Sequence, residues 1–205
     1  MNYTLDNNIA TLTLDDGKAN VVGHELLDTV NAALFSGGFD LAEFKKGPEE
    51  GMAMVGRGFE LLIRLYGFPL PLVAACTGHG IAMGAFIVMT CDSRIGTRGD
   101  FKIRLPETAI GMELPPILVE LTASRISRRH MTRVALLSEV YNPDQAVDAG
   151  FIDEVVNADD LDARAQAVAE QLAQLPQAQF AANKLSVRAG TLRAMKESLE
   201  QLAKR

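Results

Sequence analysis

The fold is decided by residues 71–85, PLVAACTGHGIAMGA. Leu72 to Cys76 form a short apolar run, which is typical of a central strand buried on both faces. A glycine-rich turn, Gly78 to Gly84, follows and opens a short buried helix from Ala85 to Thr90. The start of a helix carries unpaired N–H groups and a partial positive charge, so this turn is able to present a backbone donor to a ligand.

Working outward, the hydrophobic patterns predict one α/β domain. Another glycine-rich turn, the first of the two in chain order, spans 35–40, and residues 45–48 are expected to be mobile. The predicted elements are a hairpin over 2–15 around Asn7-Asn8, strands at 92–97, 101–105 and 151–156, and helices at 23–34, 49–66, 116–124, 128–137, 143–149, 160–174, 178–189 and 191–204.

Composition excludes several classes of function. The chain has 205 residues, is 48% apolar and carries a formal charge of −6, so it can bury a core and is a poor match for nucleic acid. It has no run of about 18 apolar residues and no secretory signal pattern, so we expect a soluble cytoplasmic protein without a membrane span. Cys76 and Cys91 are interpreted as reduced core residues, and three histidines without a Cys/His cluster predict no metal site.

The two glycine-rich turns have two interpretations. Their glycines serve tight turns and close packing, or they place two N–H donors around a developing oxyanion. Neither turn matches a phosphate loop, a dinucleotide fingerprint or a G-x-S-x-G elbow. His79 is interpreted as a packed, hydrogen-bonded residue, and His24 and His130 as residues on helix surfaces.

Several segments in order resemble the crotonase superfamily, the enoyl-CoA hydratases and isomerases. They cover nearly the whole chain: Ala19-Asn20, FSGGFDL at 35–41, residues 71–84, CDSRI at 91–95, Phe101, Pro106-Glu107 through Gly111, Pro115, and 146–156 with the helices up to Lys184. The resemblance implies a spiral of strand–strand–helix units that binds an acyl-CoA thioester. It divides the chain into an acyl-CoA-binding core, 1–156, and a helical region, 157–205.

The resemblance also assigns residues to the site. It places the two oxyanion donors at the backbone N–H groups of Phe39 and Met83. It implies no metal and no cofactor other than the coenzyme A carried by the substrate. The substrate-binding residues that it implies are Lys18, Ala19 and Val21 at the adenine end, with Lys45-Lys46 as a further basic candidate, Gly37, Asp40 and Leu41 in the first turn, and Phe86 in the acyl pocket.

One carboxylate of the family pattern is missing. Hydratases that the chain resembles have two glutamates; here the first position is Phe86 and the second is Glu107. A single base suffices to move a double bond from C3 to C2, so a 3-enoyl-CoA to 2-enoyl-CoA isomerase is favoured, with the pKa of Glu107 raised by apolar surroundings. The alternatives are a hydratase with Glu113 as second acid, a non-catalytic acyl-CoA binder, and a Glu107 that is merely a solvated loop residue.

Two further expectations concern assembly and completeness. The C-terminal helices carry an apolar stripe, which either packs within the chain or forms the interface of a homotrimer or hexamer. The stripe contains Leu161, Ala165, Val168, Leu172 and Leu175. The family has a strand before the first glycine turn, but here Leu34 leads directly into Phe35. We expect that residues are absent from the sequence at this junction.

Overall fold

The computed structural model describes residues 2–6, 9–13 and 41–202, and every structural statement below concerns these residues. The predicted helix at 23–34, the glycine turn at 35–40 and the junction of Leu34 with Phe35 lie outside them. Of the described helices, none is long and apolar enough to cross a membrane.

The main sheet contains three parallel strands in the order β3 (Val73–Cys76), β5 (Ser93–Thr97) and β7 (Glu154–Val156). All three were predicted, but β3 was expected to be central, and among the described strands the middle position belongs to β5. Burial explains the difference, because four of the five residues of β5 are buried whereas those of β3 alternate between buried and half-buried.

Two smaller pairs of strands complete the described sheets. The predicted hairpin is confirmed, since β1 (Asn2–Asp6) pairs antiparallel with β2 (Ile9–Thr13). A parallel pair joins β4 (Gly80–Ile81) to β6 (Ile103–Arg104), with Gly80 opposite Ile103 and Ile81 opposite Arg104. This short pair connects the second glycine turn to the segment that leads to Glu107.

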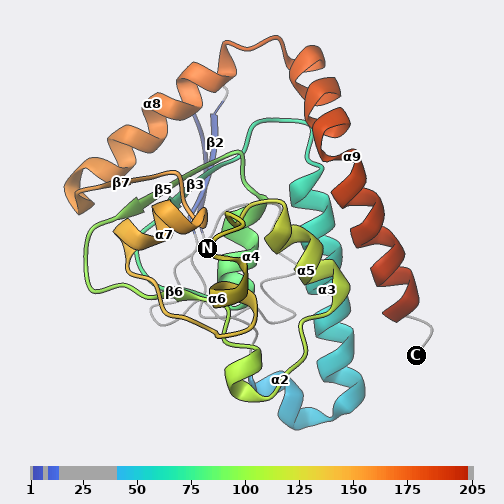
Figure 1. Cartoon of the computed structure of the whole chain (residues 1–205). Helices are drawn as coiled ribbons and strands as arrows, with labels where there is room; N and C mark the ends of the chain where they lie inside the picture. Colours follow the sequence, from blue (N-terminus) through green and yellow to red (C-terminus); the bar gives the residue numbers. More distant parts are fainter. Residues whose placement is uncertain (1, 7–8, 14–40, 203–205) are drawn as a thin grey trace.

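Helices cover the sheets, as Figure 1 shows. α3 begins at Pro48, one residue before the predicted start and within the stretch expected to be mobile, and it ends before Gly67, as predicted. The described helices are α2 (Leu41–Lys46), α3 (Pro48–Tyr66), α4 (Met83–Thr90), α5 (Pro116–Ala123), α6 (Met131–Ala135), α7 (Pro143–Ala149), α8 (Leu161–Ala173) and α9 (Gln177–Leu202), with short 3-10 turns at Thr108–Ile110 and Ala158–Asp160.

Three local predictions are wrong. The last helix is one element, α9, and not two, because Gly190 lies in open space and its cost within a helix is too small to break it. Lys45 and Lys46 form the last turn of α2 and do not lie in an irregular stretch. His130 is only 8% exposed, because its ring nitrogens lie 3.1 Å from the Tyr141 hydroxyl and 3.0 Å from the Asp148 carboxylate.

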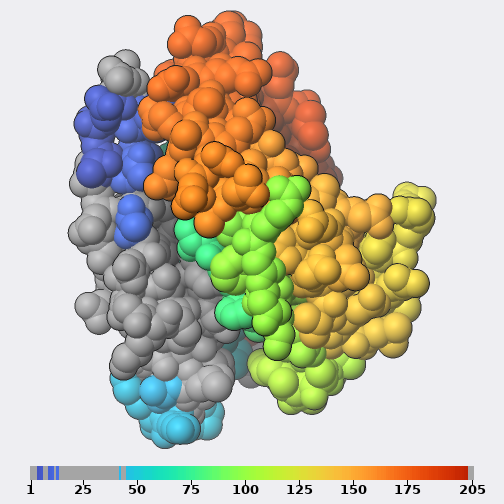
Figure 2. Space-filling view, turned by 90° about the vertical axis from the view of Figure 1, so that its left-hand side faces the viewer, coloured from blue at the N-terminus to red at the C-terminus, as the bar shows by residue number. Residues whose placement is uncertain are grey.

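The stripe on α8 packs within the chain. Leu161 and Val168 are buried against Ile95 of β5, and Ala165 and Leu172 join the same cluster. Figure 2 shows the α8 surface beside the β1–β2 hairpin. This part of the stripe therefore covers the sheet, and of its members only Leu175, at 43%, is substantially exposed.

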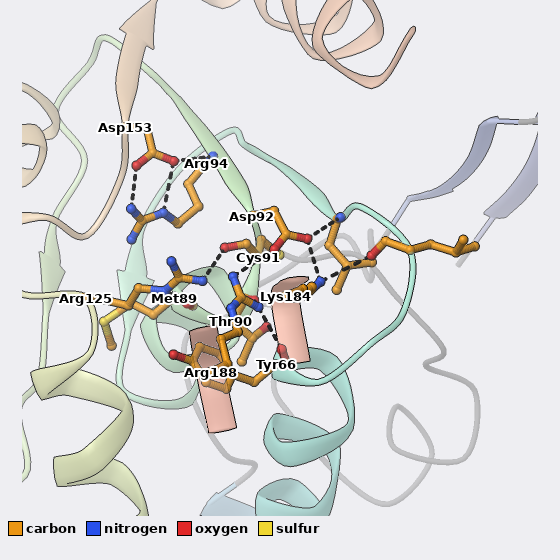
Figure 3. A network of polar contacts seen from close by, with 12 residues as sticks. Tyr66, Met89, Thr90, Cys91, Asp92, Arg94, Arg125, Asp153, Lys184 and Arg188 are labelled. Atoms are coloured by element: carbon orange, nitrogen blue, oxygen red, sulfur yellow. Dashed lines mark hydrogen bonds and ion pairs between the residues drawn. The ribbon is translucent and has the colours of Figure 1, made fainter. Parts of the chain in front are cut away.

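A buried ionic network holds α9 against the core (Figure 3). The Asp92 carboxylate accepts hydrogen bonds from Lys184 Nζ at 2.6 Å and from Arg188 Nη2 at 2.8 Å. Arg188 also donates to the carbonyls of Tyr66 at 2.7 Å and Thr90 at 3.2 Å. The network thereby joins the ends of α3 and α4 to α9.

We expect Asp92→Ala to lower the free energy of unfolding by about 3–5 kcal/mol, because it leaves two buried cations without their carboxylate. Urea denaturation measures the change. The matched control is Arg129→Ala, which breaks an exposed pair with Asp148 and should cost less than about 1 kcal/mol. Equal small losses in the two variants would contradict this view of the network.

Candidate functional site

The start of α4 presents a backbone donor within the core. Met83 is the first residue of this helix, two residues earlier than predicted, and all eight residues of α4 are buried. The first N–H groups of a helix have no partner inside it; the first one bonded here is that of Phe86, which donates to the Ala82 carbonyl at 3.1 Å. The Met83 N–H, at the first position of α4, therefore has no partner inside the helix.

An unusual backbone conformation precedes this donor. Ala82 has φ 50° and ψ −121°, a region that residues with a Cβ rarely occupy. Its N–H donates to the carbonyl of Arg104 at 3.1 Å, and the N–H of Gly80 donates to Lys102 at 3.0 Å. The β4–β6 pair thus holds a strained bend directly before Met83, a feature that often marks functional sites.

Glu107 is buried, so the alternative of a solvated loop residue is wrong. It is only 6% exposed, and its Oε2 has no hydrogen-bond partner among the described residues. Burial raises the pKa of its carboxyl, while a backbone hydrogen bond and the charge of Arg104 act in the opposite direction. A desolvated carboxylate with a free oxygen is suited to accept a proton.

The backbone around Glu107 is fixed by its own loop. The Glu107 carbonyl accepts hydrogen bonds from Met112 N at 2.8 Å and Ile110 N at 3.2 Å. Gly111 closes the turn with φ 74°, in the left-handed region that favours glycine. The Ala109 N–H bonds to the Ser138 hydroxyl at 3.2 Å, which ties the loop to the segment after α6.

The hydrogen bond from the Ala82 N–H to the Arg104 carbonyl brings the start of α4 and the segment that leads to Glu107 together. Glu107 lies three residues beyond Arg104, a span of at most about 11 Å along an extended chain. Phe86, in the first turn of α4, is 1% exposed and shares one core cluster with Met83 and Leu105. Position 86, at which the family pattern has the first of its two glutamates, is therefore occupied by an apolar, buried side chain.

Other predicted site residues are not part of this arrangement. Glu113, the reserve acid, is exposed. His79 is exposed, and its Nδ1 accepts the Lys102 N–H at 2.9 Å, in agreement with a hydrogen-bonded residue. Leu41 begins α2. Lys18, Ala19, Val21, Gly37, Phe39 and Asp40 lie outside the described residues.

Sequence reasoning missed Ala82 and Arg104. The residue type at position 82 does not indicate its backbone conformation, because a glycine and not an alanine would be expected at a positive φ. Arg104 is identified only from the structure, in which its carbonyl accepts the Ala82 N–H and its buried Nε has no hydrogen-bond partner among the described residues. Within the described ranges, no three His, Cys, Asp or Glu side chains are grouped so that they could hold a metal ion.

A small cavity lies behind α4, with a volume of about 20 Å³. Gly78, Gly80 and Gly84 line it together with Ile103 and Phe151. This volume suits about one water molecule and is far too small for an acyl chain. The acyl pocket is therefore not this cavity.

Comparisons with known proteins identify the family of the chain. Residues 15–204 match the model of the enoyl-CoA hydratase/isomerase family. An apo structure of a Mycobacterium tuberculosis protein described as an enoyl-CoA isomerase is 34% identical, has a TM-score of 0.91, and aligns with 100% of this chain and 97% of its own length; a crystal structure of the same protein describes it as a probable enoyl-CoA hydratase. A crystal structure of an enoyl-CoA hydratase from Mycobacterium ulcerans is 33% identical, has a TM-score of 0.92, and aligns over 99% of this chain and 97% of its own.

Among curated relatives, the mitochondrial enoyl-CoA delta isomerase 1 of Rattus norvegicus is 30% identical over 145 residues, which are 70% of this chain. The chain spans about half the length of that relative. The similar proteins thus include both isomerases and hydratases, and similarity alone does not choose between the two reactions.

The burial of Glu107 predicts an effect on stability. A carboxyl whose pKa is raised by folding destabilises the folded state at pH values above that pKa, and the penalty disappears below its ordinary pKa. Glu107→Gln should therefore raise the free energy of unfolding at pH 7.5 but not at pH 3.5. Urea denaturation at the two pH values measures this, with the exposed Glu113→Gln as control. A Glu107→Gln variant that is less stable than the wild type at pH 7.5 would contradict it.

Proposed function

Because the chain belongs to the enoyl-CoA hydratase/isomerase family, we propose that it is an enzyme that converts 3-enoyl-CoA into 2-enoyl-CoA with Glu107 as its single base. The observation that carries the proposal is a buried carboxylate with an oxygen unpaired among the described residues, in a chain that has the apolar, buried Phe86 where the family pattern has another glutamate. One carboxylate is sufficient for this reaction.

The proposed reaction moves one proton from C2 to C4 of the acyl chain. Glu107 takes a proton from C2, and the electron pair of the C–H bond moves into the thioester, whose oxygen becomes an enolate. The Met83 N–H stabilises that oxygen, and we assign the Phe39 N–H as the second donor. The enolate then collapses to form the C2=C3 bond, while the former C3=C4 bond takes the proton from Glu107 at C4.

Electrostatic stabilisation of the enolate provides much of the rate. One preorganised backbone donor contributes about 3–4 kcal/mol to such a barrier. The complete burial of α4 keeps its first N–H groups in a fixed direction and away from bulk water. A donor of this kind is more effective in a desolvated site than at a protein surface.

The hydratase reaction fits this geometry less well. Addition of water needs a group that positions the water in addition to one that manages the protons. Glu113, the candidate for a second acid in the same loop, is exposed, and the side chain of Phe86 has no acidic group. Hydration and thioester binding without catalysis are therefore alternative outcomes of the test below.

The remaining features of the proposal concern substrate and assembly. We assign the adenine end of coenzyme A to Lys18, Ala19 and Val21, and contacts with the thioester to Gly37, Asp40 and Leu41. We also propose a cytoplasmic homotrimer or hexamer. Exposed apolar side chains that could support such an assembly are Ile110, Leu136, Leu137 and Val187.

The assay is conversion of 3-enoyl-CoA to 2-enoyl-CoA, followed by product analysis. We expect the wild type to isomerise, Glu107→Gln to lose at least about 100-fold in kcat, and Glu113→Gln to retain activity. Formation of 3-hydroxyacyl-CoA from 2-enoyl-CoA would favour the hydratase. Binding without either reaction would favour the non-catalytic protein.

A further inference from the structure

The C-terminal end of α4 is held by two arginines from other parts of the fold. Arg188 of α9 donates through Nη1 to the Thr90 carbonyl at 3.2 Å. Arg125, two residues beyond the end of α5, donates through Nε to the Met89 carbonyl and through Nη2 to the Cys91 carbonyl, both at 2.8 Å. Figure 3 shows both guanidinium groups at this end of the helix. The last carbonyl groups of a helix have no partner inside it, so here cations satisfy them.

Hydrogen bonds link the Thr90 carbonyl to the Met83 N–H through successive peptide groups of α4. Each peptide group contains the carbonyl of one residue and the N–H of the next residue. A hydrogen bond accepted by the carbonyl therefore polarises the N–H of the same group. In order from Arg188, the peptide groups of this chain are Thr90-Cys91, Val88-Met89, Ala85-Phe86 and Ala82-Met83.

The bonds between these peptide groups have ordinary lengths. The Cys91 N–H donates to the Val88 carbonyl at 3.1 Å. The Phe86 N–H donates to the Ala82 carbonyl, also at 3.1 Å. The bond between these two is the regular bond of an α-helix, from an N–H to the carbonyl four residues earlier. The chain thus runs without a break from the guanidinium of Arg188 to the peptide group that carries the proposed donor.

We propose that Arg188 is a positioning residue that strengthens the Met83 N–H as a donor to the thioester oxygen. The inference rests on the proposed function, in which this N–H stabilises the enolate. A cationic donor forms a stronger hydrogen bond than a neutral one, and bonds in a chain polarise one another inside a protein. All eight residues of α4 are buried, so water does not screen this effect. Arg188 therefore acts on the donor through the helix and does not contact the substrate.

Lys184 is a cation of the same ionic network that does not join this chain. Lys184 and Arg188 lie four residues apart on α9, each is 7% exposed, and each donates to the Asp92 carboxylate. The other bond of Lys184 goes to the Leu70 carbonyl at 3.2 Å, and within the described residues it reaches no carbonyl of α4. Removal of either cation leaves Asp92 with the other as its partner. The two positions are therefore a matched pair that differs in the contact with α4.

The test compares Arg188→Met with Lys184→Met in the full chain. The probe is butanoyl-CoA labelled with ¹³C at the thioester carbonyl, which has no double bond to move. Infrared spectroscopy measures how far binding lowers the stretching frequency of this carbonyl. Polarisation along a chain of hydrogen bonds changes each bond by about 10–30%, so Arg188→Met should lose about that share of the wild-type downshift. Lys184→Met should keep the wild-type downshift.

Kinetics with 3-enoyl-CoA provide a second readout. Loss of a whole oxyanion donor costs about 100- to 1,000-fold in kcat, so weakening it by about 10–30% should cost about two- to eightfold in Arg188→Met. KM should stay near the wild-type value, because the donor acts more strongly on the enolate than on the bound thioester. Lys184→Met should keep the wild-type kcat. Arg188→Gln serves as the second variant where Arg188→Met does not fold, and urea denaturation shows which variants are folded.

Three results would overturn the inference. One is the full wild-type downshift in a folded Arg188→Met or Arg188→Gln variant, even where the wild type isomerises its substrate. Another is an equal loss of downshift in Lys184→Met, which would make Arg188 a support of the network alone. The third is a wild type in which binding does not lower the carbonyl frequency. If Arg188→Met alone loses part of the downshift but the wild type does not isomerise, the proposed function fails and the inference stands.

Discussion

The hydrogen bond from the Ala82 N–H to the Arg104 carbonyl is the constraint on which the candidate site depends. It closes the parallel β4–β6 pair and fixes the direction in which α4 begins. Because Glu107 follows Arg104 by three residues, the same contact limits how far Glu107 can lie from the Met83 N–H. Without it, the strained φ of Ala82 would have no support, and the first N–H groups of α4 would have no fixed direction.

The rest of the chain keeps that contact rigid. α8 covers the main sheet with an apolar stripe, and α9 is tied to the ends of α3 and α4 by Lys184, Arg188 and Asp92. The core therefore surrounds α4 on all sides, and no residue of that helix is exposed. A donor built on a fully buried helix does not need to reorganise when charge develops on a substrate oxygen.

Local patterns predicted most of the described elements, because strands and helices leave periodic signals. The alternation around residues 7 and 8 predicted the β1–β2 hairpin, and the ordered family segments pointed to Glu107. Burial could not be derived in the same way. His130 was expected on a surface and is buried by tertiary contacts, and the stripe on α8 had two possible partners in sequence, of which the structure selects the sheet.

Backbone geometry could not be predicted from the sequence either. The sequence does not show that Ala82 adopts φ 50°, because alanine rarely does so. Gly190 lies inside α9 although glycine often ends helices. Arg104 could have been interpreted as an ordinary strand residue, and only the structure shows that its carbonyl accepts the Ala82 N–H.

A crystal structure with a non-reactive acyl-CoA thioester analogue tests the central claim most directly. The account predicts the thioester oxygen within about 2.7–3.1 Å of the Met83 N–H, and the Glu107 carboxylate facing C2 of the acyl chain. A thioester oxygen bound away from the start of α4, or a Glu107 carboxylate turned away from C2, would contradict it.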